Sequence, residues 1–173
     1  MDESTDVPKT TLDQHFTRFY SIEHDICVCR HNNGILMLMI AEHHSVIKNL
    51  SSIAVEKIEF RDVAQVSGKR KRGGTTIQDG TKLASVFMSD GTVIEVRSPV
   101  RGVLLEINDA LCTKPELIQN DPFNRGYLCT VLPMGRNDLK DAQKSCIGLI
   151  PKQDYFTRKQ HPDINSLSTF PAT

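Results

Sequence analysis

The 173-residue sequence lacks several features that would identify a class of protein at once. It contains no tryptophan, and only 6% of its residues are aromatic. No apolar run approaches the roughly 18 residues that a membrane-spanning helix requires, and the longest, residues 34–41, has the length of a buried strand. The formal net charge is zero, with 21 basic and 21 acidic side chains, so the charge balance requires neither nucleic acid nor an anionic membrane as a partner.

An export signal and a disulfide framework are also missing from the pattern. Residues 1–11 are polar and acidic, which is not the composition of a secretory signal peptide. The 5 cysteines are an odd number, which does not favour a closed set of disulfides. We therefore expect reduced thiols in the cytosol or the nucleus.

What the chain does contain is a series of short strand patterns. Alternating apolar residues, bounded by Gly, Asp, Asn and Pro, predict strands near residues 26–31, 35–40, 53–60, 83–88, 92–97, 102–107 and 126–132. This spacing indicates a mainly β fold of the barrel or sandwich type. Residues 12–21 predict a short helix or an ordered arm that packs its aromatics on the domain. A helix of one or two turns is expected to start around 113–116, where a proline stands, and further short helices are expected near 139–144 and 152–159.

The clearest local pattern is a hairpin at residues 87–97. Asp90 and Gly91 lie between alternating apolar residues, and both residue types tolerate the positive φ of a tight primed turn. We therefore expect Gly91 to be exposed at the hairpin tip, and Gly102 to lie where the chain turns back into the barrel. Core contacts are predicted, subject to bulges near Pro99, for Val93, Val96, Val103, Leu105 and Ile107.

A resemblance to a known family begins at Ser98. Residues 98–128, SPVRGVLLEINDALCTKPELIQNDPFNRGYL, resemble the second half of the glycine-cleavage H protein. The shared residues are Ser98, Pro99, Val100, Gly102, Glu106, Asn108, Leu111, Pro115, Glu116, Leu117, Asn120, Asp121, Pro122 and Gly126. The resemblance implies a flattened barrel-sandwich hybrid of two hammerhead halves, mainly β, with short peripheral helices.

The sequence departs from that family at the cofactor site. Lipoyl H proteins carry their modified lysine in the hairpin, and the matching position of this chain is Gly91. No lysine occurs between Lys82 and Lys114. Since a swinging arm needs an amine at the exposed tip, we predict that no cofactor is bound. A lipoyl-type carrier that uses Lys82 or another lysine remains the alternative.

A second family matches nearly the whole chain, from about Leu12 to Pro133. The pieces LDQHFTRFYS, ILMLMIAEHH, VSGKRKRGG, SDGTVIEVRSPVRG and RGYLCTVLP resemble the Abitram (Simiate) family of lipoyl-like domain proteins. The aromatic segment at 16–20 weighs most, because it is not an H-protein feature. This resemblance implies a non-enzymatic actin-binding protein that acts on filament assembly and filopodia, is found in nuclear speckles and has a link to transcription.

The resemblance also sets expectations about partners, location and domain organisation. It implies actin, as monomer or filament, as the partner, and residence in the nucleus and in the cytoplasm, including actin-rich cell projections. A monomer is expected, with no direct nucleic-acid or membrane binding. A generic scaffold module is a further alternative. The expected organisation is a disordered start at 1–11, one lipoyl-like domain at 12–159 and a loose tail at 160–173.

One dense run of charge stands out, at Lys69, Arg70, Lys71 and Arg72. It is interpretable as a nuclear-import signal or as a contact for an acidic surface such as that of actin. It is equally interpretable as a solvated hairpin loop, because glycines flank it on both sides. The sequence leaves these interpretations open.

Two clusters of potential ligands or catalysts favour ordinary structural roles. Cys27, Cys29 and His31 share one strand face and could hold zinc, but this spacing places the two sulfurs about 7 Å apart. Buried structural cysteines are therefore favoured. His43 and His44 are accompanied by no nucleophile motif, so we interpret them as loop histidines and predict no catalytic residue.

Overall fold

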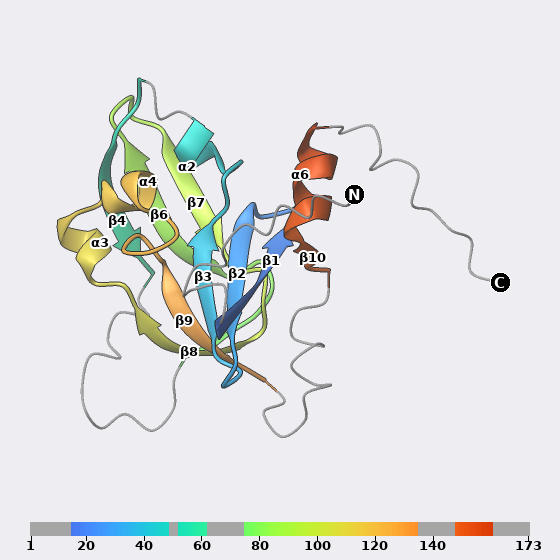
Figure 1. Cartoon of the computed structure of the whole chain (residues 1–173). Coiled ribbons are helices and arrows are strands. Elements are labelled where there is room, and N and C mark those ends of the chain that lie inside the picture. The colour runs from blue at the N-terminus through green and yellow to red at the C-terminus, as the bar shows by residue number, and fades with distance from the viewer. Residues whose placement is uncertain (1–14, 49–51, 62–74, 135–147, 161–173) are drawn as a thin grey trace.

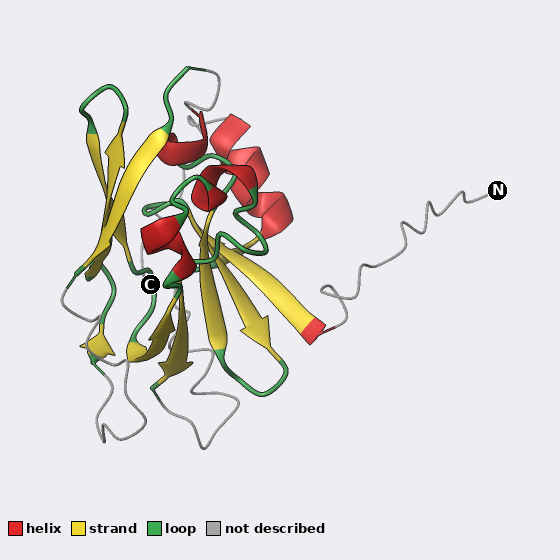
Figure 2. Cartoon of the chain, turned by 90° about the vertical axis from the view of Figure 1, so that its left-hand side faces the viewer, coloured by secondary structure: helices red, strands yellow, loops and turns green. Residues whose placement is uncertain are grey.

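Two antiparallel sheets with short helices at their periphery form the protein (Figures 1 and 2). The structure is a computed structural model that describes residues 15–48, 52–61, 75–134 and 148–160. Its strands are β1 (Phe16–Ser21), β2 (Ile26–His31), β3 (Leu36–Ile40), β4 (Val55–Phe60), β5 (Thr76–Ile77), β6 (Lys82–Met88), β7 (Val93–Arg97), β8 (Gly102–Ile107), β9 (Cys129–Pro133) and β10 (Ile150–Pro151). Its helices are α2 (Ser45–Lys48), α3 (Ala110–Thr113), α4 (Leu117–Asn120) and α6 (Lys152–Gln160).

The strand order leaves both sheets open. The larger sheet has the 7-stranded order β10-β1-β2-β3-β9-β8-β5, and the smaller one has the 3-stranded order β4-β6-β7. Each sheet therefore has two edge strands, and within the described residues no barrel closes. The mainly β fold with short peripheral helices is confirmed. None of the helices in the described ranges has the length and apolar character needed to cross a bilayer.

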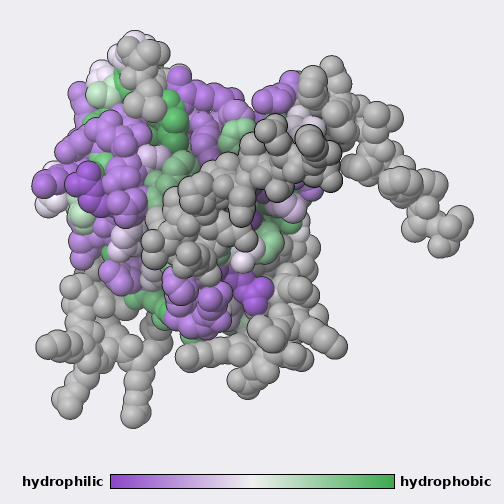
Figure 3. Space-filling model, viewed as in Figure 1, coloured by the Kyte–Doolittle hydropathy of each residue, from purple (hydrophilic) through white to green (hydrophobic). Residues whose placement is uncertain are grey.

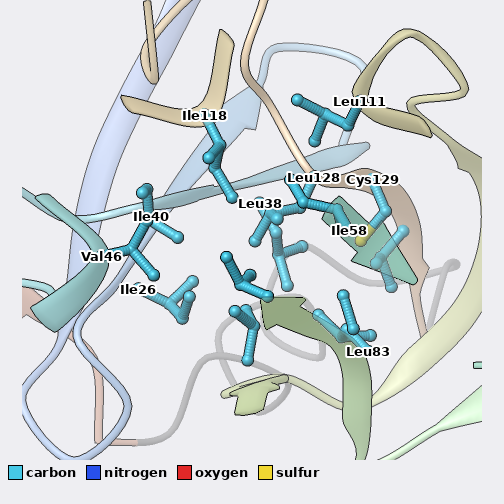
Figure 4. Close-up of a cluster of buried hydrophobic side chains, with 14 of the residues drawn as sticks. Ile26, Leu38, Ile40, Val46, Ile58, Leu83, Leu111, Ile118, Leu128 and Cys129 are labelled. Carbon is cyan, nitrogen blue, oxygen red and sulfur yellow. The ribbon is translucent and has the colours of Figure 1, made fainter. Parts of the chain in front are cut away.

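The main core fills the space between the two sheets. Alternate residues of the larger sheet, such as Ile26, Leu38 and Ile40, point at residues of the smaller sheet, such as Ile58 (Figure 4). The short helices contribute from the side through Val46, Leu111 and Ile118. Because strand side chains alternate between faces, one set of apolar residues per strand suffices to form this interior.

A second, smaller core lies on the opposite face of β1, β2 and β3. Tyr20, Cys27, Cys29, Met39 and Ala41 are buried there together with Tyr155 of α6. The rings of Tyr20 and Tyr155 stack with their centroids 4.7 Å apart, and the Tyr155 hydroxyl donates a 2.8 Å hydrogen bond to Asp25 Oδ1. Helix α6 therefore completes the fold as the cover of a second apolar layer.

Several local predictions need correction. Residues 16–21 form a strand rather than a helix, because they pair with β2 along their whole length, and their aromatics do pack on the domain. The short helix expected to start around 113–116 is present as α4, whereas α3, which precedes Pro115, was not expected. Lys114 has φ −132° and ψ 69°, because the proline ring disfavours the helical region for the residue before it. The helix expected at 152–159 is confirmed as α6.

The predicted core residues of the hairpin region are partly wrong. Val96 is fully buried, and Ile107 packs against the main core. Val93 is 49% exposed and Leu105 is 40% exposed, whereas Leu104 is buried. Val93 and Val96 are three positions apart in a regular strand and cannot share a face. On β8, a register shift between Leu104 and Glu106 reverses the alternation, so Leu104 and Ile107 both point inward.

Buried polar side chains connect the short helices to the sheets. Gln119 Nε2 donates to the carbonyls of Val46 at 2.9 Å and Ile53 at 3.1 Å, and its Oε1 accepts from Val55 N–H at 3.1 Å. Asn108 Nδ2 donates to the carbonyl of Tyr127 at 2.8 Å. Since a buried polar group left unpaired is costly, these bonds fix the position of α4, which carries Gln119, and of the segment after β8, which carries Asn108.

Predictions for residues 1–11, 139–144 and 161–173 lie outside the described residues. Helix α6 ends at Gln160, one residue into the predicted tail.

We predict that Gly102→Ala destabilises the protein. A Cβ at this position would lie 2.4 Å from the carbonyl oxygen of Leu132 and 2.6 Å from Val131 Cγ1. The chains of β8 and β9 would have to separate, which we expect to lower the free energy of unfolding by about 1–3 kcal/mol in urea denaturation. Arg101→Ala, at the neighbouring exposed position, is the control, because surface substitutions usually change stability little. An unchanged urea midpoint for Gly102→Ala would contradict the close packing.

We predict a pH-dependent contribution from His44. Burial lowers the pKa of this imidazole to about 4, so it accepts a proton more readily in the unfolded chain than in the fold. Its contribution is therefore complete above its ordinary pKa near 6.5 and is lost as pH falls toward 4. The stability advantage of wild type over His44→Asn should shrink by about 3 kcal/mol between pH 7 and pH 4.

The Asn variant retains an acceptor for the 3.2 Å bond that Val46 N–H donates to His44 Nδ1. His15→Asn, at an exposed position, is the matched control. Urea unfolding at several pH values gives the measurement. A stability difference for His44→Asn that stays constant across this range would show that burial does not exclude the proton.

Candidate functional site

The tip of the β6–β7 hairpin is built as a tight, well-bonded turn. Gly91 N–H donates to the carbonyl of Met88 at 2.9 Å, and Met88 N–H donates to the carbonyl of Thr92 at 2.8 Å. Ser89 N–H donates to the carbonyl of Ala54 at 2.8 Å, and Ser89 Oγ accepts from Ala54 N–H at 3.1 Å. These reciprocal bonds fasten the tip to the segment before β4.

Gly91 lies at this tip and is exposed, as predicted. Its φ of +82° is left-handed, whereas Asp90 is not among the residues with positive φ. The expected primed turn is therefore wrong. The bonding pattern is that of a type I turn followed by a left-handed glycine, which is the usual three-residue hairpin loop.

Asp90 stabilises the turn through its side chain. Its carboxylate accepts a 2.9 Å hydrogen bond from Thr92 N–H. This bond from the backbone of Thr92 lowers the pKa of Asp90. Asp90 therefore has a local structural role in the loop. Its carboxylate has no amine nitrogen that could form an amide bond with a cofactor.

The residues at the tip do not fit a lipoyl group. An amide-linked arm requires an amine, and Ser89, Asp90, Gly91 and Thr92 supply none. Gly91 has no side chain to modify. We derive no step of carrier chemistry through this position.

Lys82, the lysine of the carrier alternative, lies at the other end of β6. It is about 20 Å along the strand from Met88, at about 3.3 Å per residue. Its Nζ is bound to Glu95 Oε1 at 2.9 Å, and the hydrogen bond from Lys82 is the main cause of the lowered pKa of Glu95. Lys57 of β4 pairs beside Phe87, and its ammonium is bound to Glu59. Neither amine is presented at the tip.

The basic run Lys69, Arg70, Lys71 and Arg72 lies outside the described residues. The described chain ends before it at Arg61 and resumes at Thr75. Arg61 N–H donates to the carbonyl of Leu83 at 3.0 Å, and the carbonyl of Thr75 accepts from Leu104 N–H at 2.9 Å. Each flank of the run is therefore attached to a different sheet.

The exposed face seen in Figure 3 is of mixed polarity, with hydrophilic surface predominating over the described residues. The large hydrophobic side chains that are exposed in the described part of the chain come from three different segments. Val93, Leu105 and Met134 are 49%, 40% and 39% exposed. Single exposed apolar residues are ordinary on soluble surfaces, so they do not mark a docking site.

The cysteine cluster has the structural role favoured by its sequence. Cys27 and Cys29 are buried in the second core, and a hydrogen bond with Cys29 together with burial raises the pKa of the Cys27 thiol. His31 lies at the end of β2, with its ring 4.9 Å from that of Phe16. Its Nδ1 accepts a 3.2 Å bond from Asn33 N–H. The two thiols therefore contact each other in the second core, whereas the His31 side chain contacts Phe16 and Asn33.

A polar cleft of about 340 Å³ opens beside β7. The turn between β1 and β2 lines it with Glu23, His24 and Asp25, the segment after β3 adds His43 and His44, and β7 adds Ile94, Glu95 and Arg97. His44 is buried and His24 Nε2 is 3.0 Å from Asp79 Oδ1. His43 and His44, which were interpreted as loop histidines, therefore line one concave site together with His24.

The turn that lines this cleft and the neighbouring turn at 78–81 are both held firmly. Asp25, with φ +50°, accepts from Tyr155 and lies 2.6 Å from Lys159 Nζ. The turn at 78–81 is closed by Thr81 N–H, which donates to the carbonyl of Gln78 at 3.0 Å, and by Gly80 N–H, which donates to that of Ser98 at 2.8 Å. Sequence reasoning missed this cluster because His24 and Asp79 are 55 positions apart, and only the sheet order brings them together.

Comparison with known proteins agrees with this fold. The family model described as "Glycine cleavage H-protein" matches residues 20–147. The crystal structure of a glycine cleavage system H protein from Mycobacterium marinum superposes with a TM-score of 0.58 at 18% identity, covering 83% of this chain and 96% of that protein. At 18% identity, this superposition is evidence for a shared fold and for nothing further.

Sequence relatives cover nearly the same length. Protein Abitram of Homo sapiens is 30% identical over 86% of this chain and 86% of the relative. Protein Abitram of Dictyostelium discoideum is 30% identical over 89% of this chain and 90% of the relative. Protein Abitram of Danio rerio is 28% identical over 84% and 86%. The chain therefore belongs to the Abitram family, with a domain of the glycine cleavage H-protein type.

Proposed function

We propose that this protein is a non-enzymatic actin-binding protein that regulates actin polymerisation and filopodium dynamics. It acts in the cytoplasm and actin-rich cell projections, and in nuclear speckles it takes part in transcription regulation. It works as a monomer, and its partner is actin, as monomer, filament or both. Binding to nucleic acid or to a membrane is not part of the proposal.

The observation that carries the proposal is membership of the Abitram family over most of both chains. The sequence resemblance to that family implies the actin role. The sequence resemblance includes the aromatic segment at 16–20, which is not an H-protein feature, and this segment lies in β1, an integral strand of the larger sheet. The segment that distinguishes the two families is thus part of the folded domain.

The hairpin tip supports a binding role over a carrier role. A lipoyl carrier transfers groups through an arm on an exposed amine, and the tip of this hairpin offers none. A shared fold does not imply a shared activity when the reacting side chain is absent. No observation on the described residues favours the carrier or the generic scaffold as a second function.

We predict that purified protein co-sediments with actin filaments, and that replacing the basic run weakens this. Substituting Lys69, Arg70, Lys71 and Arg72 with Ser should lower filament affinity roughly tenfold at low salt, because several weak charge contacts act together. The salt dependence of binding should also flatten. Pelleting at low and moderate salt tests the basic run as a contact for actin. The nuclear fraction of a tagged protein tests it as a nuclear-import signal.

The matched control replaces four exposed lysines elsewhere with Ser: Lys48, Lys57, Lys114 and Lys152. It removes the same charge but leaves the run intact, so it should pellet nearly as wild type does. If wild type fails to pellet and leaves polymerisation kinetics unchanged, the actin proposal is wrong. If both quadruple variants behave as wild type in pelleting and in nuclear fraction, the basic run is a solvated loop.

We predict that the protein is not lipoylated. Intact mass after co-expression with a lipoate ligase should equal that of the unmodified chain, because the tip has no amine and Lys82 is paired with Glu95. A glycine cleavage H protein expressed in parallel is the positive control. An added lipoyl mass would overturn the non-carrier reading, and Lys82→Arg would then test whether Lys82 is the modified residue.

A further inference from the structure

We propose that Glu23, His24 and Asp79 form a binding site for a first-row divalent metal ion such as Zn²⁺. The three residues each offer one ligand atom, and these atoms all lie within 4.8 Å of one another. This inference does not depend on the proposed actin function.

The geometry of the three side chains suits one small ion. Ligand atoms bound at about 2.0–2.2 Å lie about 3.3–3.6 Å apart around a tetrahedral centre. His24 Nε2 and Asp79 Oδ1 are already 3.0 Å apart. Because His24 is mostly buried, with only 12% of its side chain exposed, while Asp79 is 69% exposed, the imidazole is fixed and the carboxylate can adjust.

The backbone positions the ligands before any ion binds. Ser21 Oγ accepts a 3.2 Å hydrogen bond from His24 N–H, and Lys159 Nζ holds the same turn by donating to the carbonyl of Ile22 at 3.3 Å. On the other side, Arg97 donates to the carbonyl of Gly80 at 2.8 Å, next to Asp79. Ligands on rigid turns lose little freedom when they bind an ion.

The local charge pattern leaves a place for a cation. Asp25 is paired with Lys159, and Glu95 is paired with Lys82 and Arg97. Asp79 contacts His24, and Glu23 forms no hydrogen bond or ion pair within the described ranges. Two carboxylates beside one imidazole therefore lack a cationic side-chain partner there, and a divalent ion supplies the opposite charge.

The donor set selects the class of metal. One imidazole nitrogen with two carboxylate oxygens suits zinc and its first-row neighbours, whereas calcium and magnesium prefer oxygen ligands alone. Three protein ligands leave at least one coordination position open. Glu23 and His24 also line the 340 Å³ cleft, so a water molecule or a partner's side chain has room to complete the shell.

The test is calorimetric titration of the full-length protein with Zn²⁺, with the rise in melting temperature as a second readout. We expect one specific site per chain. Affinity should fall by about tenfold or more in Glu23→Gln, His24→Ala and Asp79→Asn. Glu23→Gln decides most sharply, because this exposed residue has no contact to lose in the described part, so its melting temperature without metal should equal that of wild type.

Controls separate this site from other zinc ligands on the chain. His15→Ala and Cys112→Ser, both at exposed positions, should bind zinc as wild type does. Titration with Co²⁺ should give an absorption spectrum without sulfur-to-cobalt charge transfer, because all three ligands are nitrogen or oxygen. Absence of zinc binding by wild type, wild-type affinity in Glu23→Gln and Asp79→Asn, or a sulfur charge-transfer band would each overturn the proposal.

Discussion

Strand β2 must be buried on both of its faces, and much of the architecture follows from that requirement. Ile26 and Val28 point into the space between the sheets, while Cys27 and Cys29 point the other way. The first pair needs the smaller sheet as cover, and the second pair needs α6. If β2 were apolar on one face only, the two sheets alone would bury it, and its other face could contact water. The C-terminal helix is therefore as much a part of the domain as the hairpin is.

The sequence predicted the positions of the strands and helices better than it predicted which of their side chains point into the core. Strand positions, the exposed tip at Gly91 and the burial of Val96 follow from local alternation and turn chemistry. The exposure of Leu105 does not, because the bulge in β8 depends on which strand lies opposite. The exposure of Val93 does follow from regular alternation with the buried Val96. The pairing of His24 with residue 79 is less predictable still. It depends on two turns that meet only once the sheets have their final order.

The hairpin shows how a carrier scaffold can keep its geometry without its chemistry. Turn formation depends on backbone bonds and on Ser89 and Asp90, and none of these interactions involves the side chain at position 91. Replacing a lysine there with glycine removes an amine and leaves the loop well bonded. The glycine cleavage H-protein domain is therefore compatible with a protein that works by contact alone, because fold and reactive group are physically separable.

The pairing of β1 with β10 joins the two ends of the described chain. On a translating ribosome, β1 and β2 emerge long before Pro151 and Tyr155. Until then the nascent chain presents the outer face of β2 and the free edge of β1 to solvent, both of which favour association with other chains. Synthesis of β10 and α6 therefore completes this cover, and a chain that stops before α6 is prone to aggregate.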